Sequence, residues 1–161
     1  MIRNAIKEDI PEMERLLEQI LAVHHAARPD LFRAEGRKYD AAQLEEIIGT
    51  PGLPVFVDVE EGRLAGYIMC REQFTGSATQ FPIRTLYVDD LCVDERFRGR
   101  GIGRKLFACA REYAKANGFY NVTLHVWEGN PGGMAFYRAM GMKPQYTSME
   151  LIVSEQEYLC L

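Results

Sequence analysis

A glycine-rich segment that carries four positive side chains is the part of the sequence best suited to bind a ligand. It spans residues 98–105, RGRGIGRK, and joins a β-rich stretch to an amphipathic helical pattern. A turn of this kind places backbone N–H groups at a helix N-terminus, where the helix dipole favours negative charge. Glycines let the backbone approach phosphate oxygens because no Cβ intervenes. The segment therefore predicts a phosphate-binding loop.

The spacing of the glycines excludes two common phosphate ligands. The G-x-x-x-x-G-K-[ST] pattern of nucleoside triphosphate sites is absent, since no Gly-Lys-Ser or Gly-Lys-Thr occurs. The dinucleotide pattern G-x-G-x-x-G fails too, because its third glycine would fall on Arg104 or Leu106. The chain has a net charge of −4, so any anion site must be a local group of positive charges such as this loop. Binding to nucleic acid through bulk electrostatics is therefore not expected.

Side chains that could move protons lie on two further segments. Asp89 and Asp90 lie in the β-rich stretch before the loop, and Tyr137 lies on a short helical pattern after it. On a regular strand, Asp89 shares one face with residues 87, 91 and 93, and Asp90 points to the other face. A carboxylate can accept a proton from an amine, and a phenol can donate one. No metal is expected, because the three histidines form no H-E-x-x-H motif and the four cysteines no C-x-x-C pair.

The elements that must position these residues follow from hydrophobic periodicity and turn residues. In the first half we expect a strand at 2–6, a helix from Asp9 to before Pro29, a helix at 40–49, and strands at 54–59, 64–70 and 85–93. After the loop we expect a helix ending at Gly118, a strand at 122–127, a helix at 134–140, and one or two closing strands in the tail that holds Met149, Leu151 and Val153. The uncharged residues 73–82 are interpreted as a loop. This is a mixed α/β (α+β) fold in the order β-α-α-β-β-β-α-β-α-β-β, predicted as one domain over residues 1–161.

Two motifs together resemble the GNAT acetyltransferase superfamily. Residues 98–103 match the pyrophosphate-loop pattern [RQ]-x-x-G-x-[GA], and Asn130 followed by Ala135-Phe136-Tyr137 resembles a second family segment. That segment departs from the family in its Pro131-Gly132-Gly133 insert, which we expect to delay the helix start, and in ending on Gly-Met rather than Gly-Phe. The element order also looks like that of the family, so the resemblance covers nearly the whole chain.

The resemblance implies acetyl transfer from acetyl-CoA to a primary amine of a small molecule or peptide, by direct attack in a ternary complex. Tyr137 lies where the family places its general acid. Asp89 is the candidate base, since the acidic strand resembles that of diamine acetyltransferases, with Glu72 or a water chain in reserve. The cofactor would contact the backbone of Leu91, Cys92 and Val93, the loop residues Arg98, Gly99, Arg100, Gly101, Ile102, Gly103 and Arg104, and Asn130. Cys92 as an acetyl-accepting nucleophile is disfavoured, because no histidine lies near it in sequence.

Several questions stay open at this level. A non-catalytic acyl-CoA-binding module would keep the loop and lack a working acid and base. The acceptor amine is not specified by the sequence, although the acidic strand favours a cationic one. Family members often dimerise, so a homodimer is one expectation. The apolar segments are too short to cross a bilayer, and acidic residues interrupt the N-terminal region, so no membrane partner and a cytoplasmic location are expected.

Overall fold

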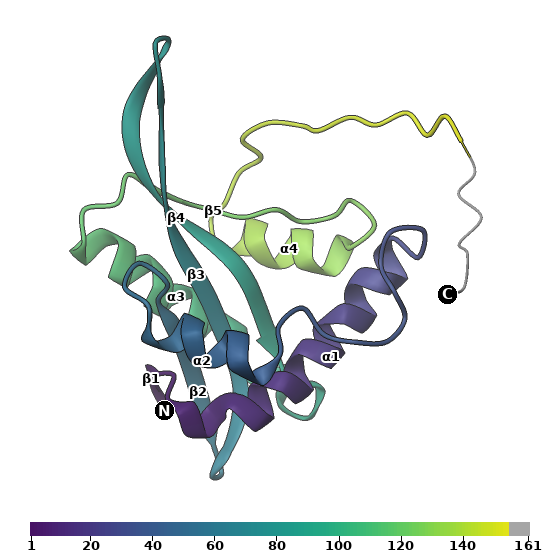
Figure 1. Cartoon of the computed structure of the whole chain (residues 1–161), viewed down its shortest axis with the longest axis vertical. Helices are drawn as coiled ribbons and strands as arrows, with labels where there is room; N and C mark the ends of the chain where they lie inside the picture. Colours follow the sequence, from purple (N-terminus) through teal and green to yellow (C-terminus); the bar gives the residue numbers. More distant parts are fainter. Residues whose placement is uncertain (155–161) are drawn as a thin grey trace.

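The structure, a computed structural model, describes residues 1–154 and shows one mixed sheet with helices on both faces (Figure 1). The strands are β1 (Ile2–Asn4), β2 (Val55–Glu60), β3 (Arg63–Ser77), β4 (Gln80–Val93) and β5 (Asn121–Thr123). The α-helices are α1 (Ile10–Ala27), α2 (Ala41–Gly49), α3 (Ile102–Ala116) and α4 (Pro131–Ala139). These nine elements occur in the predicted order, which confirms the mixed fold up to residue 139.

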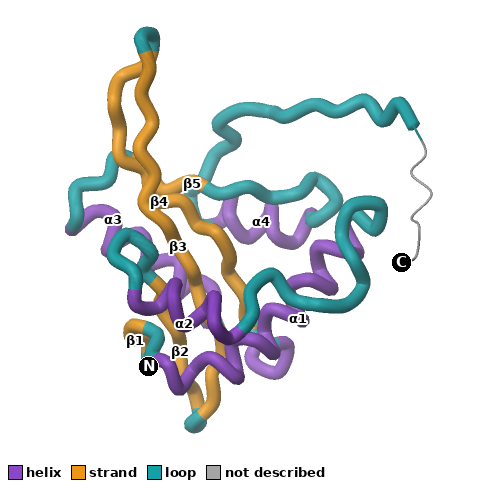
Figure 2. Tube along the Cα trace, viewed as in Figure 1, coloured by secondary structure: helices purple, strands orange, loops and turns teal. Residues whose placement is uncertain are grey.

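The sheet has the order β1-β2-β3-β4-β5, antiparallel throughout except for the parallel pair β4–β5 (Figure 2). Helices α1 and α2 cover one face, where Met13, Leu16 and Leu44 are fully buried against Val57 and Tyr67. The helix α3 covers the opposite face, and α4 packs at its edge. Each face thus buries its own apolar cluster, the arrangement expected when a sheet has two helical layers.

Strands β3 and β4 form a hairpin that extends beyond the helical layers (Figure 1). The prediction of a loop at residues 73–82 is wrong, because Gln73 pairs with Thr85 and Thr75 with Ile83. The side chains here are uncharged and partly β-branched, so they suit a strand once an antiparallel partner supplies the backbone hydrogen bonds. That partner lies across a turn and cannot be inferred from local composition.

A β-bulge interrupts β4 at the acidic pair. Met69 on β3 pairs with Asp90 and Cys70 pairs with Val88, so Asp89 is the extra residue. A bulge reverses the alternation of side chains beyond it. Both carboxylates therefore lie on the α1 and α2 face, where they contact Lys38, Tyr39 and Tyr67. The prediction that Asp90 points to the face opposite Asp89 is wrong for this reason.

The expected closing strands are not found in the described residues. Residues 143–153 are extended and exposed, and no backbone hydrogen bond joins them to the rest of residues 1–154. A strand exists only where a partner pairs with its backbone, so the apolar pattern of this tail is not sufficient to make one. Strand β5 is also shorter than predicted, since its pairing with β4 ends at Thr123. Within residues 1–154, no helix combines the length and apolarity needed to cross a bilayer.

Candidate active site

The glycine-rich segment forms the turn that starts α3. Gly99 and Gly101 have φ values of +79° and +77°, a conformation that other residues rarely adopt. The first helical hydrogen bond runs from the Lys105 N–H to the Gly101 carbonyl at 3.1 Å. The N–H groups of residues 102–104 precede this bond and have no acceptor within the helix. They are therefore available to an anion at the positive end of the helix dipole.

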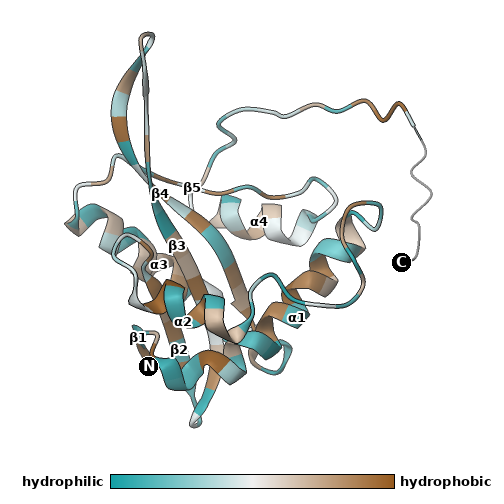
Figure 3. Cartoon of the chain, viewed as in Figure 1, coloured by the Kyte–Doolittle hydropathy of each residue, from teal (hydrophilic) through white to brown (hydrophobic). Residues whose placement is uncertain are grey.

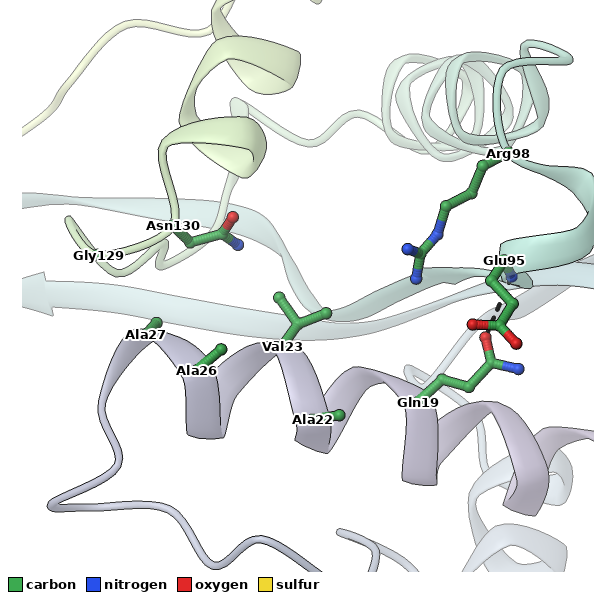
Figure 4. A pocket seen from close by; sticks show the side chains of 9 residues that line it. All are labelled: Gln19, Ala22, Val23, Ala26, Ala27, Glu95, Arg98, Gly129 and Asn130. Carbon is green, nitrogen blue, oxygen red and sulfur yellow. Dashed lines mark hydrogen bonds between the residues drawn. The ribbon is translucent and has the colours of Figure 1, made fainter.

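Salt bridges reduce the positive charge of this loop. Arg100 lies 3.0 Å from Glu61, and Lys105 lies 3.3 Å from Glu60, both at the β2–β3 turn. The Arg98 guanidinium instead extends from the loop toward α1, and its Nε donates to the Val93 carbonyl at 3.4 Å (Figure 4). Arg98 is thus the loop cation that points into the cavity beside α1.

Two cavities with one lining residue in common, Asn130, lie beside the loop. One of about 430 Å³ lies between α1 and the loop and is lined by Val23, Arg98 and Asn130 (Figure 4). The other, of about 220 Å³, lies between β4 and residues 124–127. Asn130 lines both, and its Oδ1 accepts a hydrogen bond from the Gly133 N–H at 3.0 Å, which caps α4. This cap allows α4 to begin at Pro131, so the predicted delay of the helix start is wrong.

The smaller cavity exists because β4 and β5 diverge. The two strands pair only as far as Tyr87 and Thr123, so the following part of β4 has a free edge on this side. Leu91 and Val93 line the cavity, whereas the Cys92 side chain is buried against α1 and its Sγ lies 3.4 Å from the Leu16 carbonyl. Burial raises the pKa of the Cys92 thiol to about 12, which opposes any nucleophilic role.

Tyr137 lies on α4 and lines the same cavity. Its ring packs against Phe136 and Phe107, with centroids 5.1 and 6.1 Å away. Burial, followed by the charge of Asp90, raises the pKa of Tyr137 well above its usual value, so the phenol stays protonated. No described residue accepts a hydrogen bond from this hydroxyl. The third glycine of the loop, Gly103, permits this packing, since a Cβ there would lie 3.3 Å from the Phe136 ring.

Asp89 is surrounded by positive and hydrogen-bonding groups. Its carboxylate accepts hydrogen bonds from Lys38 at 2.8 Å and Tyr39 at 2.7 Å, and Arg71 lies 3.8 Å away. Burial alone would raise the pKa of Asp89, but the hydrogen bonds from Lys38 and Tyr39 outweigh it and lower the pKa below the usual range. The carboxylate that was expected to attract a cationic amine is therefore already neutralised by this chain.

Asp90 has the opposite environment. Its side chain is almost fully buried and accepts one hydrogen bond, from the Tyr67 hydroxyl at 3.0 Å. Burial raises the pKa of Asp90 to about 6. A carboxyl group with this pKa changes protonation near neutral pH, as a general base must. Asp90 lines the cavity together with Tyr137.

Two further acidic residues, Glu72 and Asp94, line neither cavity. Glu72, the reserve base, lies on β3 in an ion pair with Arg84 at 2.6 Å and does not line either cavity. Asp94, directly after β4, is buried and binds Arg15 at 2.7 Å and Arg96 at 2.6 Å, which ties α1 to the strand end. The sequence analysis missed Lys38, Tyr67 and Asp94, because their roles depend on partners that are distant in the sequence.

Among residues 1–154, no group of histidines, cysteines or acids could hold a metal ion. Cys160 lies outside the described residues.

Similarity to known proteins agrees with this geometry. A solved structure of a mutant Bacillus halodurans protein has a TM-score of 0.91 and 32% identity, and the match covers 96% of this chain and 99% of that one. An uncharacterized N-acetyltransferase of Methanocaldococcus jannaschii is 33% identical over 142 residues, which are 88% of this chain and only 60% of that relative. A Bos taurus thialysine N-epsilon-acetyltransferase is 29% identical over 133 residues, 83% of this chain and 72% of the relative.

The sheet opens between β4 and β5 on the side of the glycine turn that starts α3. The model of the Acetyltransferase (GNAT) family matches residues 20–142, well over half of the sequence. The chain therefore belongs to the GNAT acetyltransferase family and is an acyltransferase.

Proposed function

We propose that this chain transfers the acetyl group of acetyl-CoA to a primary amine of a small molecule or peptide. The observation that carries the proposal is that one cavity is lined both by Gly103, at the start of α3, and by Asp89, Asp90 and Tyr137. Arg98 and residues 99–104 would hold the pyrophosphate. The free edge of β4 at residues 91–93 would pair with the pantetheine amides, and Asn130 would contact the cofactor between them.

The chemistry follows from the groups around the smaller cavity. The neutral amine attacks the thioester carbonyl carbon, a C–N bond forms, and the C–S bond breaks to release the CoA thiolate. A backbone N–H at the β4 edge stabilises the oxyanion, and the Tyr137 hydroxyl gives its proton to the thiolate. The nitrogen of the new amide loses its surplus proton, which returns to the Tyr137 oxygen directly or through water and restores the phenol. The ammonium form of an alkylamine has a pKa near ~10.4, so a base must remove one proton before attack.

The acidic pair on β4 is the proposed destination of that proton. Asp89, the candidate from the sequence, has a lowered pKa and is a weak proton acceptor while Lys38 and Tyr39 bind it. Asp90 has its pKa raised to about 6 and faces the same cavity. We therefore assign Asp90 as the proton acceptor, directly or through water, and Asp89 as the group that holds Lys38 and Tyr39 in place.

The chemical class of the acceptor amine is inferred from the names of the relatives and from the charges around Asp89. The Bos taurus and Sus scrofa relatives are named for the side-chain amine of thialysine, which supports a small primary amine here. Lys38 and Arg71 balance the carboxylate of Asp89, so a strongly cationic polyamine is less favoured than an amine of low net charge.

The proposal is tested by removing one hydroxyl. In Tyr137→Phe the ring packing against Phe136 persists, and kcat should fall by roughly 10²–10⁴ while acetyl-CoA affinity changes little. Tyr113→Phe, which removes a hydroxyl on α3 where the ring packs against Phe56 and Phe119, is the matched control and should keep full turnover. The measurement is CoA thiol release with a panel of primary amines. Full turnover in Tyr137→Phe would exclude Tyr137 as the acid.

A further inference from the structure

We infer that Arg71 is a specificity-determining residue that binds a carboxylate at the far end of the acceptor amine. The acceptor would be an amino acid whose amine and carboxylate are separated by several methylenes. The inference rests on the proposed acetyl transfer and adds to it the chemical group that the acceptor must carry besides its amine.

Arg71 lies beside the place where the proposed reaction brings the amine. Both carboxylates of the acidic pair lie on the face of the sheet that α1 and α2 cover, and the Arg71 guanidinium is 3.8 Å from the Asp89 carboxylate. Strand β3 is mostly hydrophobic over residues 64–70 and hydrophilic over residues 71–73, where its full burial also ends (Figure 3). Arg71 is therefore the first residue of this strand that an acceptor can reach beyond the acidic pair.

The Arg71 guanidinium is held in position by an aromatic ring. Its Cζ lies 4.9 Å from the centre of the Tyr87 ring, which packs at 5.4 Å against His125, a residue of the cavity wall. The 3.8 Å that separates Arg71 from Asp89 is too long for a hydrogen bond. Among residues 1–154, no other carboxylate pairs with Arg71. The guanidinium is thus oriented, but no carboxylate of the described chain occupies its donors.

Arg84 on β4 shows what an occupied guanidinium looks like in this sheet. It also stacks on an aromatic ring, with its Cζ 4.4 Å from the centre of Phe119. Its donors, however, bind Glu72 at 2.6 Å and the Asn117 carbonyl at 2.7 Å. A planar guanidinium binds a carboxylate through two parallel hydrogen bonds. Arg71 has the same kind of support as Arg84 and lacks the carboxylate.

The charges around the acidic pair also favour a carboxylate on the acceptor. Lys38 and Arg71 carry two positive charges, and Asp89 supplies one negative charge between them. Asp90 is the proposed acceptor of the proton from the amine. A carboxylate on the acceptor would supply the missing negative charge, whereas a diamine would bring a second ammonium group toward Arg71 and be repelled.

The pairing of β3 with β4 sets the length of the acceptor. Asp90 pairs with Met69, and Arg71 lies two residues further along β3. Two residues of a strand span about 7 Å. An extended alkyl chain advances about 1.3 Å per bond, so four or five methylenes separate an amine from a carboxylate by this distance. An α-amino acid with no second amine is too short to reach both groups.

The experiment compares acceptors that differ only at the far end. The substrates are ε-aminocaproate, pentylamine and cadaverine, which share five methylenes and end in a carboxylate, a methyl hydrogen and a second amine. At saturating acetyl-CoA, thiol release gives kcat/KM for each. The wild type should prefer ε-aminocaproate over pentylamine by roughly 10- to 100-fold, the usual worth of hydrogen bonds between charged groups, and Arg71→Met should remove this preference.

Two further variants complete the comparison. Arg71→Glu should reverse the order and favour cadaverine over ε-aminocaproate, because the far ammonium then meets a carboxylate. The matched control is Arg84→Met, which removes the other stacked guanidinium and should keep the preference of the wild type. Circular dichroism of each variant verifies that it is folded.

The possible failures of the inference and of the proposed reaction can be told apart. Wild-type turnover with equal kcat/KM for ε-aminocaproate and pentylamine would overturn the inference and leave acetyl transfer standing. A preference that persists in Arg71→Met would place the carboxylate elsewhere. A loss in Arg71→Met that is equal for all three acceptors would show that Arg71 only balances Asp89. No turnover with any amine would overturn both the proposed function and the inference.

Discussion

Replacing Asp90 with asparagine should stabilise the protein at neutral pH while removing its proton acceptor. The pKa of Asp90 is raised from 3.8 to about 6 by burial, so the folded state binds this proton more tightly than the unfolded state. Each tenfold change in proton affinity corresponds to ~1.4 kcal/mol, so the ionised side chain costs about 3 kcal/mol of stability. Asparagine carries no charge and still accepts the hydrogen bond from Tyr67.

The pH dependence of the stability difference between Asp90→Asn and the wild type tests whether the raised pKa of Asp90 causes that difference. Below pH ~4 Asp90 is protonated in both states, and Asp90→Asn should match the wild type. The advantage of the variant should grow between pH ~4 and pH about 6, where the unfolded chain ionises first, and stay near ~3 kcal/mol above that range. Urea unfolding at a series of pH values measures this difference. A difference that does not change with pH would refute the assignment of a raised pKa to Asp90.

The neighbouring residue supplies a control of opposite sign. The pKa of Asp89 is lowered by Lys38 and Tyr39, so its stabilisation is present above pH ~4 and is lost as the pH falls through the folded-state pKa. Asp89→Asn should therefore be less stable than the wild type at neutral pH, and the gap should close in acid. In activity, wild-type kcat/KM should fall below pH about 6, and Asp90→Asn should be slow at every pH.

Two further substitutions test the glycine-rich loop and the ion pairs of Asp94. Gly101→Asp should weaken acetyl-CoA binding more than Gly101→Asn, because both residues tolerate a positive φ and only aspartate repels phosphate. Calorimetry measures both affinities, and equal values for the two variants would argue against the proposed position of the pyrophosphate. Asp94→Asn should lower the free energy of unfolding by about 1–3 kcal/mol, because Arg15 and Arg96 lose a buried acceptor, and an unchanged urea midpoint would contradict that role.

The sequence predicted the elements whose signals are local. The glycine turn, the helices and the order of the first nine elements follow from periodicity and from residues such as Gly101 and Gly118. The family could be predicted from two local motifs, without knowledge of contacts between distant residues. The position of Tyr137 on the helix after Asn130 was likewise readable from the second motif.

The features that the sequence did not predict all depend on pairing between distant residues. The bulge that turns Asp90 toward the cavity arises from the register of β4 against β3, which places Met69 opposite Asp90. Lys38 and Asp89 are 51 positions apart in the sequence, so local patterns could not predict that Lys38 neutralises the Asp89 carboxylate. The tail carries a strand pattern, but a strand also needs a backbone partner, and residues 149–153 pair with none among residues 1–154.

The most direct test of the central claim follows an isotopically labelled acetyl group. The full chain is incubated with labelled acetyl-CoA and a panel of primary amines, and mass spectrometry follows the label while a thiol reagent counts the released CoA. We expect one acetylated amine for each thiol released, with wild-type rates that exceed those of Tyr137→Phe. Saturable acetyl-CoA binding without label on any amine would contradict the account and would define the chain as an acyl-CoA-binding module.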